Sequence, residues 1–278
     1  MEKNEILKET VRQKYSEIAT QDKTINQASC CGAGGCSTEV YNIMTDDYQD
    51  LNGYVPDADL GLGCGLPTQF AKIKKGDTVI DLGSGAGNDC FVARAEAGDD
   101  GRVIGIDFTA AMIEKAKANA ARLGYQNVEF RLGDIGQMPV SDNTADVVVS
   151  NCVLNLVPDK DGVFKEIFRV LKPGGHFSIS DIVLGGPLPD ALRSDAEMYA
   201  GCVSGAILKD ACLQLMADNG FTNISVQKEK AIILPEDILQ RYLSAGEIAD
   251  FNTRNNGILS ITVYAEKPAA CCGSSCCN

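Results

Sequence analysis

The chain has 278 residues, 45% of them hydrophobic and 23% charged, which is typical of a globular protein that buries a sizeable core. The formal net charge of -13 argues against a surface built to bind nucleic acid or anionic lipid. No apolar run approaches the roughly 20 residues of a membrane-spanning helix, and the N-terminus does not resemble a signal peptide, so we expect a cytoplasmic protein.

The first segment, residues 1–70, is expected to be a helix followed by a cysteine-bearing lead-in. Residues 1–25 are polar with a sparse apolar stripe and predict a helix. Residues 28–38 are a loop rich in glycine and cysteine, which cannot continue a helix.

From Gly76 onward, short apolar segments alternate with helical ones, and this alternation predicts a parallel sheet with helices on both faces. It defines a second segment, residues 71–186. The predicted strands are 78–82, 103–107, 128–132, 145–150 and 176–184, and the predicted helices are 88–97, 110–123 and 159–171, the last stopped by Pro173-Gly174-Gly175.

The third segment, residues 187–268, begins with an apparent insertion at 187–208 and then returns to the alternating pattern. It is predicted to contain a helix at 209–219, a strand at 222–229, a helical stretch at 235–250 and a strand at 258–266. Residues 269–278 form a low-complexity tail of cysteine, glycine and serine that we expect to be disordered.

A glycine-rich loop, Asp81–Gly87, joins the first of these strands to a helix. Gly83 and Gly85 permit a tight turn and close approach of a ligand, although glycines alone predict no more than a turn. Asp107 ends the next strand, where this kind of fold places an acid for ribose hydroxyls, and Asp134 follows the third strand, within reach of an adenine. A carboxylate at position 81 would repel phosphate but suits a cationic ligand such as the amino group of S-adenosylmethionine.

These motifs, together with Leu171–Gly175, resemble the class I methyltransferase family over about residues 70–185. The resemblance implies an α/β, Rossmann-like, mostly parallel sheet and makes residues 71–186 the S-adenosylmethionine-binding domain. The cofactor-binding residues that it implies are Asp81, Gly83 and Gly85 for the methionine part, Asp107 for the ribose, and Asp134 with Ile135 for the adenine.

Five single cysteines lie between the N-terminal group and the tail. Cys152 follows the fourth strand, where this fold places the methyl acceptor, although burial as a small apolar side chain is the alternative. Cys64 and Cys202 are flanked by glycines, which predicts exposed loops. Cys90 and Cys212 lie inside predicted helices and are expected to be ordinary packed side chains.

The segments around Cys64, Cys152 and Cys202 resemble the arsenite methyltransferase family. The resemblance implies that Cys152 and Cys202 bind As(III) as thiolates, with Cys64 as a third or exchanging ligand, and that 187–268 carries the arsenic-binding region. It also implies that an N-terminal cysteine forms a disulfide with Cys64 during turnover.

The identity of that N-terminal cysteine is open. An early Tyr15 followed by the adjacent pair Cys30 and Cys31 resembles the pattern of the family, whereas Cys36 is nearer to Cys64 in the sequence. We favour Cys31.

This chemistry agrees with the residue inventory. Thiolates select soft, thiophilic centres, and As(III) bound by three of them keeps a lone pair that can attack a methyl group without a general base. The single histidine, His176, is expected to be structural. Arsenite and methylarsenite are the expected substrates. Methyl transfer oxidises arsenic to As(V), so vicinal thiols would reduce it and glutathione or thioredoxin would reduce the resulting disulfide.

Two other functions are considered. A small-molecule carbon methyltransferase of the same fold would explain the cofactor motifs but not the three cysteines. A non-catalytic thiol protein that binds metal would explain the tail cysteines but not Asp107 and Asp134. The tail itself is expected to be dispensable.

Overall fold

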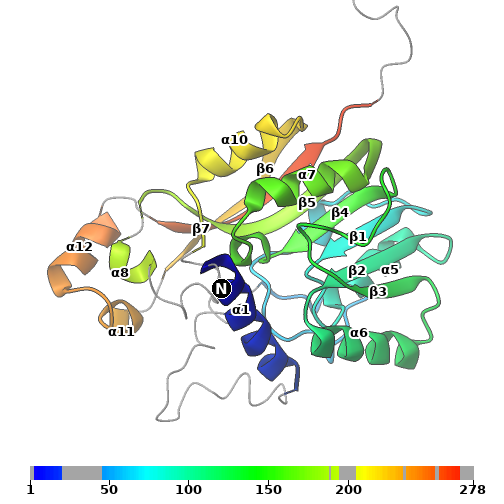
Figure 1. The fold of residues 1–278 in the computed structure, drawn as a ribbon, viewed down its shortest axis with the longest axis horizontal. Coiled ribbons are helices and arrows are strands. Elements are labelled where there is room, and N and C mark those ends of the chain that lie inside the picture. Colours follow the sequence, from blue (N-terminus) through cyan, green and yellow to red (C-terminus); the bar gives the residue numbers. More distant parts are fainter. Residues whose placement is uncertain are drawn as a thin grey trace, which may run out of the picture.

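Seven strands form one sheet in the order β3-β2-β1-β4-β5-β7-β6 (Figure 1). The computed structural model describes residues 3–20, 46–187, 189–193, 205–233, 236–253 and 257–269. Strands β1 to β5 are parallel, and β7 is antiparallel to both of its neighbours, which confirms the predicted mostly parallel sheet. The strands are Thr78–Leu82 (β1), Arg102–Asp107 (β2), Val128–Leu132 (β3), Ala145–Asn151 (β4), Leu171–Leu184 (β5), Thr222–Ile232 (β6) and Ile258–Glu266 (β7).

Helices cover both faces of the sheet, which explains why its central strands carry buried apolar side chains on both faces. In β4, Val147 and Val149 pack into one buried cluster and Val148 into another, and all three are fully buried. The helices on the Val147 face are α5 (Asn88–Ala97) and α6 (Ala110–Leu123), and those on the Val148 face are α7 (Lys160–Val170) and α10 (Lys209–Asp218).

Helix α1, Lys3–Thr20, lies beside α6 (Figure 1). Ile18 packs against Met112 of α6, whereas Val11 belongs to the same buried cluster as Cys64 and Cys152. The lead-in ends in a single helical turn, α4 (Pro67–Phe70). The apolar stripe of α1 therefore packs on α6 and on the region of Cys64 and Cys152 at once.

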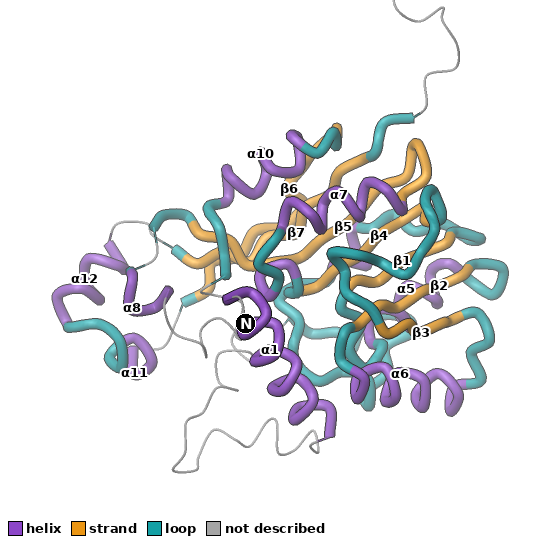
Figure 2. Tube along the Cα trace, in the orientation of Figure 1, coloured by secondary structure: helices purple, strands orange, loops and turns teal. Residues whose placement is uncertain are grey.

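Three short helices gather beyond one end of the sheet (Figure 2): α8 (Asp190–Arg193), α11 (Glu236–Leu239) and α12 (Ala245–Thr253). The sequence predicted a single helical stretch over 235–250, and the two separate helices correct that expectation. Ser244 explains the break, because its backbone N–H and hydroxyl both donate to the Glu247 carboxylate and so start a new helix at α12.

The structure also corrects the predicted start of the fifth strand, at Pro173-Gly174-Gly175. The sequence predicted that this segment separates a helix ending near 171 from a strand beginning at 176, but β5 already begins at Leu171. Its backbone is paired here, because Gly174 N–H donates to the carbonyl of Lys267 and Lys267 N–H donates to that of Gly175.

Several predictions concern residues outside the described ranges: Cys30, Cys31, Cys36, Cys202 and the tail beyond residue 269. Among the helices that are described, none has the length and apolar character needed to traverse a bilayer.

Candidate active site

The glycine-rich loop connects β1 to α5 and lies directly against the segment that follows Cys152. Gly83 and Gly85 have φ angles of +67° and +51°, in the left-handed region that favours glycine. Gly83 has no room for a side chain either, since an added Cβ would lie 2.4 Å from Cγ2 of Val153. This contact brings the predicted cofactor loop and the predicted acceptor segment together.

Two of the predicted carboxylates are buried beside this loop. Asp107, at the end of β2, accepts hydrogen bonds from the backbone N–H groups of Gly85 at 3.0 Å and Thr109 at 2.8 Å. Asp81, within β1, accepts one from the Cys90 thiol at 3.1 Å. Burial raises the pKa of both carboxyl groups, and the charge of a neighbouring carboxylate, Asp89, raises that of Asp81 further.

Asp134, which follows β3, is half-buried. Lys8 of α1 lies across it and forms an ion pair with its carboxylate. Ile135, the next residue, is buried. Helix α1 therefore covers the end of the site at which the sequence places the adenine.

All of the predicted cofactor residues line one cavity, whose open volume is about 1050 Å³ including its mouth. Cys152 lines the same cavity. The predicted residues on its wall are Asp81, Gly83, Gly85, Asp107, Asp134 and Ile135.

The cavity wall also carries buried polar atoms without a hydrogen-bond partner among the described residues. These atoms are Ser84 Oγ and Asn88 Oδ1. Buried polar atoms are normally paired, because an unpaired one loses its hydrogen bonds to water. Their presence on the wall fits a polar ligand.

Asp89 is a functional candidate that the sequence reasoning missed. It lies in the first turn of α5, is buried, lines the cavity, and accepts hydrogen bonds from the Tyr48 hydroxyl at 3.0 Å and from Asn151 Nδ2 at 3.1 Å. Burial raises the pKa of its carboxyl group to about 6, although both hydrogen bonds lower it. Its place directly after the glycine loop was the available signal.

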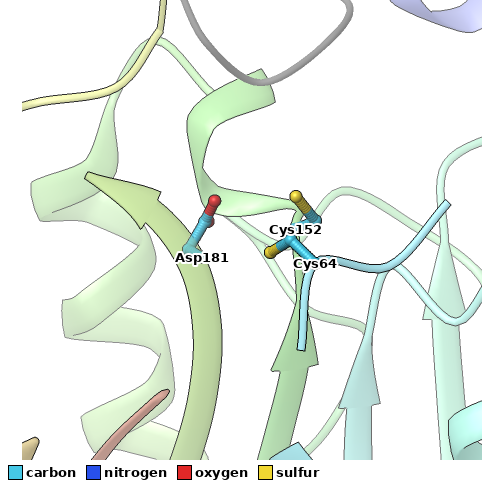
Figure 3. A group of neighbouring side chains, drawn as sticks. All are labelled: Cys64, Cys152 and Asp181. Carbon is cyan, nitrogen blue, oxygen red and sulfur yellow. The ribbon is translucent and has the colours of Figure 1, made fainter. Parts of the chain in front are cut away.

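Cys64 and Cys152 come together at the carboxyl end of β4 (Figure 3). Their sulfur atoms and a carboxylate oxygen of Asp181 all lie within 4.8 Å of one another, and all three residues are buried. Cys152 directly follows β4 with a φ of +60°, and its N–H donates to the Ser180 carbonyl at 2.8 Å. Two thiols that converge beside this cavity can hold a thiophilic atom there.

The burial of Cys64 corrects the expectation of an exposed loop, since its side chain is 0% exposed. The flanking glycines serve close packing instead. An added Cβ on Gly63 would lie 2.6 Å from Nδ2 of Asn151, and one on Gly65 would lie 2.6 Å from Oγ of Ser180.

Comparison with known proteins agrees with this geometry. The sequence profile of a family described as "Methyltransferase domain" matches residues 73–220. An arsenite methyltransferase of Halobacterium salinarum is 42% identical over 277 residues, which cover 94% of this chain and 67% of that relative. The chain belongs to the arsenite methyltransferase family. A second member, from Aquipseudomonas alcaligenes, is 33% identical over 84% of this chain and 68% of its own length.

A solved structure agrees as well. The crystal structure of an arsenic(III) S-adenosylmethionine methyltransferase from Chlamydomonas reinhardtii matches with a TM-score of 0.63 and 27% identity, covering 86% of this chain and 75% of that one. The chain thus spans about two thirds of the length of the two arsenite methyltransferases above and three quarters of this one.

In this arsenite methyltransferase fold, Asp181 of β5 holds the turn that carries Cys152. Its Oδ2 accepts the Leu154 N–H at 2.9 Å, and its Oδ1 accepts the Asn155 side-chain amide at 2.9 Å and the Ile182 N–H at 2.7 Å. Burial raises the pKa of this carboxyl group to about 6. The sequence reasoning missed Asp181, although an acid in the middle of an apolar strand was a signal.

The other described cysteines, Cys90 and Cys212, are not part of this pair. Cys90 is fully buried in α5, as expected, and burial raises the pKa of its thiol. Cys212 is only half-buried in α10. The single histidine, His176, lies in β5, where its ring packs on Tyr264, and it is not part of the cavity wall.

Proposed function

We propose that the chain methylates trivalent arsenic, transferring methyl groups from S-adenosylmethionine to As(III) held by cysteine thiolates and giving mono- and dimethylated products. One observation carries the proposal. Cys152 lies on the wall of the cavity that Asp81 and Asp107 share, and the thiol of Cys64 lies beside it.

S-Adenosylmethionine supplies a methyl group on a cationic sulfonium sulfur. The buried carboxylates of the cavity suit a cation, and the open backbone at Gly85 allows close approach, since nothing lies within 4 Å of an added Cβ. The residues that would hold the cofactor are Asp81 with Gly83 and Gly85 at the methionine part, Asp107 at the ribose, and Asp134 with Ile135 at the adenine.

Cys64, Cys152 and Cys202 would hold the arsenic. When arsenous acid reacts with a thiol, an As–O bond is replaced by an As–S bond and the thiol proton leaves in water. The lone pair of arsenic then forms the As–C bond as the sulfur–methyl bond breaks. No proton is lost from the nucleophile, so the described part of the site has no need of a general base, and its main contribution is to align donor and acceptor.

Methyl transfer raises arsenic formally to As(V), and two thiolates can return two electrons by leaving as a disulfide. Cys31 and Cys64 are the pair that the family resemblance favours, with Cys30 and Cys36 as alternatives to Cys31. Glutathione or thioredoxin would then reduce this disulfide as co-substrate.

The direct test is to incubate the protein with arsenite, S-adenosylmethionine and glutathione and to separate the arsenic species by chromatography. Methylated arsenic should form only when the cofactor is present. A protein that leaves arsenite unmethylated but transfers the methyl group to a quinone ring would instead be the carbon methyltransferase considered above. The non-catalytic thiol protein is already the weaker hypothesis, because the family match and the cavity both indicate an enzyme.

A further inference from the structure

A chain of partly buried hydrogen bonds joins Cys64 to the cavity wall through Asn151, the last residue of β4. The Cys64 N–H donates to Asn151 Oδ1 at 3.0 Å. On the other side of the same amide, Nδ2 lies 2.8 Å from the Gly65 carbonyl and 3.1 Å from Oδ2 of Asp89. Since Cys152 follows Asn151 in the chain, one amide contacts the segments of both thiols.

Asn151 packs tightly against the segment that carries Cys64. The close approach of Gly63 to this amide, described above, is possible only without a side chain at position 63. Asn151 therefore touches the backbone before, at and after Cys64. A rotation of this amide would move the first thiol relative to the second.

Asp89 lies at the cavity end of the same chain of contacts. Tyr48 donates its hydroxyl to Asp89 and also receives a hydrogen bond from Asn151 Nδ2 at 2.5 Å. Asp89 is close enough to Asp81 for their charges to interact. Of the described residues on the cavity wall, Lys8 alone is a cation, and it is paired with Asp134. Asp81 and Asp89 are thus two buried carboxylates that share a space without a cationic partner.

We propose that Asp89, together with Asp81, receives the α-ammonium group of the methyl donor, and that Asn151 transmits this binding to Cys64. The inference rests on the proposed function, which puts the methyl donor in the cavity and arsenic on Cys64 and Cys152. A buried ammonium group between two carboxylates offsets their mutual repulsion. An ionised Asp89 holds the Nδ2 side of the Asn151 amide, so Oδ1 stays turned toward the Cys64 N–H.

Donor binding and arsenite binding should then favour each other. Any such coupling between two sites is reciprocal, so arsenite must tighten donor binding by the factor by which the donor tightens arsenite binding. Asn151 is a positioning residue in this scheme, since it acts through Cys64 and Asp89.

The first experiment tests Asp89 without arsenic. S-Adenosylhomocysteine keeps the ammonium group but cannot donate a methyl group, so its affinity for the full-length protein can be measured by calorimetry beside that of an analogue lacking the α-amino group. Asp89→Asn should weaken binding of S-adenosylhomocysteine by about ten- to a hundredfold and leave binding of the deaminated analogue nearly unchanged. Equal losses for both ligands would overturn the role of Asp89.

The second experiment tests Asn151. Affinity for S-adenosylhomocysteine is measured with and without saturating arsenite, and the native protein should show tightening of at least about fivefold. Asn151→Ala and Asn151→Asp should bring this factor close to one. The aspartate variant is the sharper of the two, because it keeps an acceptor for the Cys64 N–H and loses the donor to Asp89.

Asn155→Ala is the matched control. Asn155 is another buried amide of the same segment, but it donates to Asp181 and to the Ile182 carbonyl instead of Asp89. This variant should keep the coupling. The inference fails if an Asn151 variant keeps it too, if Asn155→Ala loses it equally, or if a native protein that methylates arsenite shows no coupling. A native protein that never methylates arsenite contradicts the proposed function instead, and the first experiment still decides the role of Asp89.

Discussion

The sulfur atoms of Cys64 and Cys152 lie within 4.8 Å of each other, although one belongs to the lead-in before β1 and the other to the turn after β4. Glycines on both sides of Cys64 and the hydrogen bonds of Asn151 create this proximity. The two thiols are therefore positioned to chelate a thiophilic atom before it arrives, so the loss of either one should weaken its binding.

Cys152→Ser should reduce methylation of arsenite by at least about 100-fold, or about 2.7 kcal/mol of activation free energy, because a hydroxyl is a poor ligand for a soft centre. Binding of S-adenosylmethionine should persist. Cys202→Ser is predicted to behave in the same way. Cys212→Ser is the control, since that half-buried residue is outside the cavity wall, and it should stay within about threefold of native activity. Product chromatography measures all three, and near-native turnover by Cys152→Ser would refute the arsenic site.

Cys64→Ser should spare methylation of methylarsenite more than methylation of arsenite. Methylarsenite has only two exchangeable positions, so two remaining thiols suffice to hold it. The measurement is kcat/KM for the two substrates in native and variant protein. Equal loss on both substrates would contradict the role of Cys64 as the third ligand.

Asp181→Asn should loosen the turn that carries Cys152. The amide NH₂ of asparagine would then face a hydrogen-bond donor and could not accept from it. That donor is the Leu154 N–H if the NH₂ takes the place of Oδ2, or the Asn155 amide and the Ile182 N–H if it takes the place of Oδ1. The lost hydrogen bonds should cost about 1–3 kcal/mol of unfolding free energy. KM for arsenite should rise while affinity for S-adenosylhomocysteine changes little. The measurements are denaturant unfolding and steady-state kinetics, and the variant Asp210→Asn, at an exposed position, is the control. If Asp181→Asn weakens the binding of arsenite and of S-adenosylhomocysteine alike, the substitution disturbs the whole fold and not the turn that carries Cys152.

Acidification should stabilise the ligand-free protein through Asp89. Its folded pKa of about 6 lies above the ~3.9 of an unfolded aspartate, so the folded state binds more protons between these values. The contribution of this group to stability is complete below pH 4 and is lost as the pH rises through 6. From pH 7 to pH 5, native protein should gain on the order of 1 kcal/mol relative to Asp89→Asn. Unfolding curves at both pH values test this, and a constant difference between the two proteins would refute it.

Removal of residues 269–278 should leave turnover largely intact, because this tail is a low-complexity run of cysteine, glycine and serine that follows β7 in the sequence. The measurement is kcat for arsenite with excess glutathione. A loss of more than about tenfold, or about 1.4 kcal/mol, would make the tail cysteines part of the mechanism.

Local patterns were enough to predict the central sheet and a set of residues that line one cavity. The Val147–Val149 run specifies a strand buried on both faces, and acids such as Asp107 and Asp134 lie at strand ends, whose position follows from the alternation itself. The antiparallel insertion of β7 between β5 and β6 has no local signal, because strand order depends on which edges remain unpaired.

The sequence was least informative where a residue matters through a distant neighbour. The glycines around Cys64 predicted exposure because the same residue type serves flexible loops and close packing. Only the positions of Asn151 beside Gly63 and of Ser180 beside Gly65 distinguish these roles. Asp89 and Asp181 were missed for a related reason. Each acts through hydrogen bonds to segments that are distant in the sequence, and no sequence pattern around either residue predicts which residues it will bind.

The position of β7 has a consequence for the order in which the molecule is completed. Ser260 of this strand donates its hydroxyl to the carbonyl of Cys64 at 2.5 Å, so the last strand fixes the first thiol of the pair. During synthesis, Cys64 and Cys152 leave the ribosome well before Ser260 does. A growing chain that ends before β7 has both thiols but not the contact that holds Cys64, and the Cys64–Cys152 pair is therefore fully assembled only once β7 has been made.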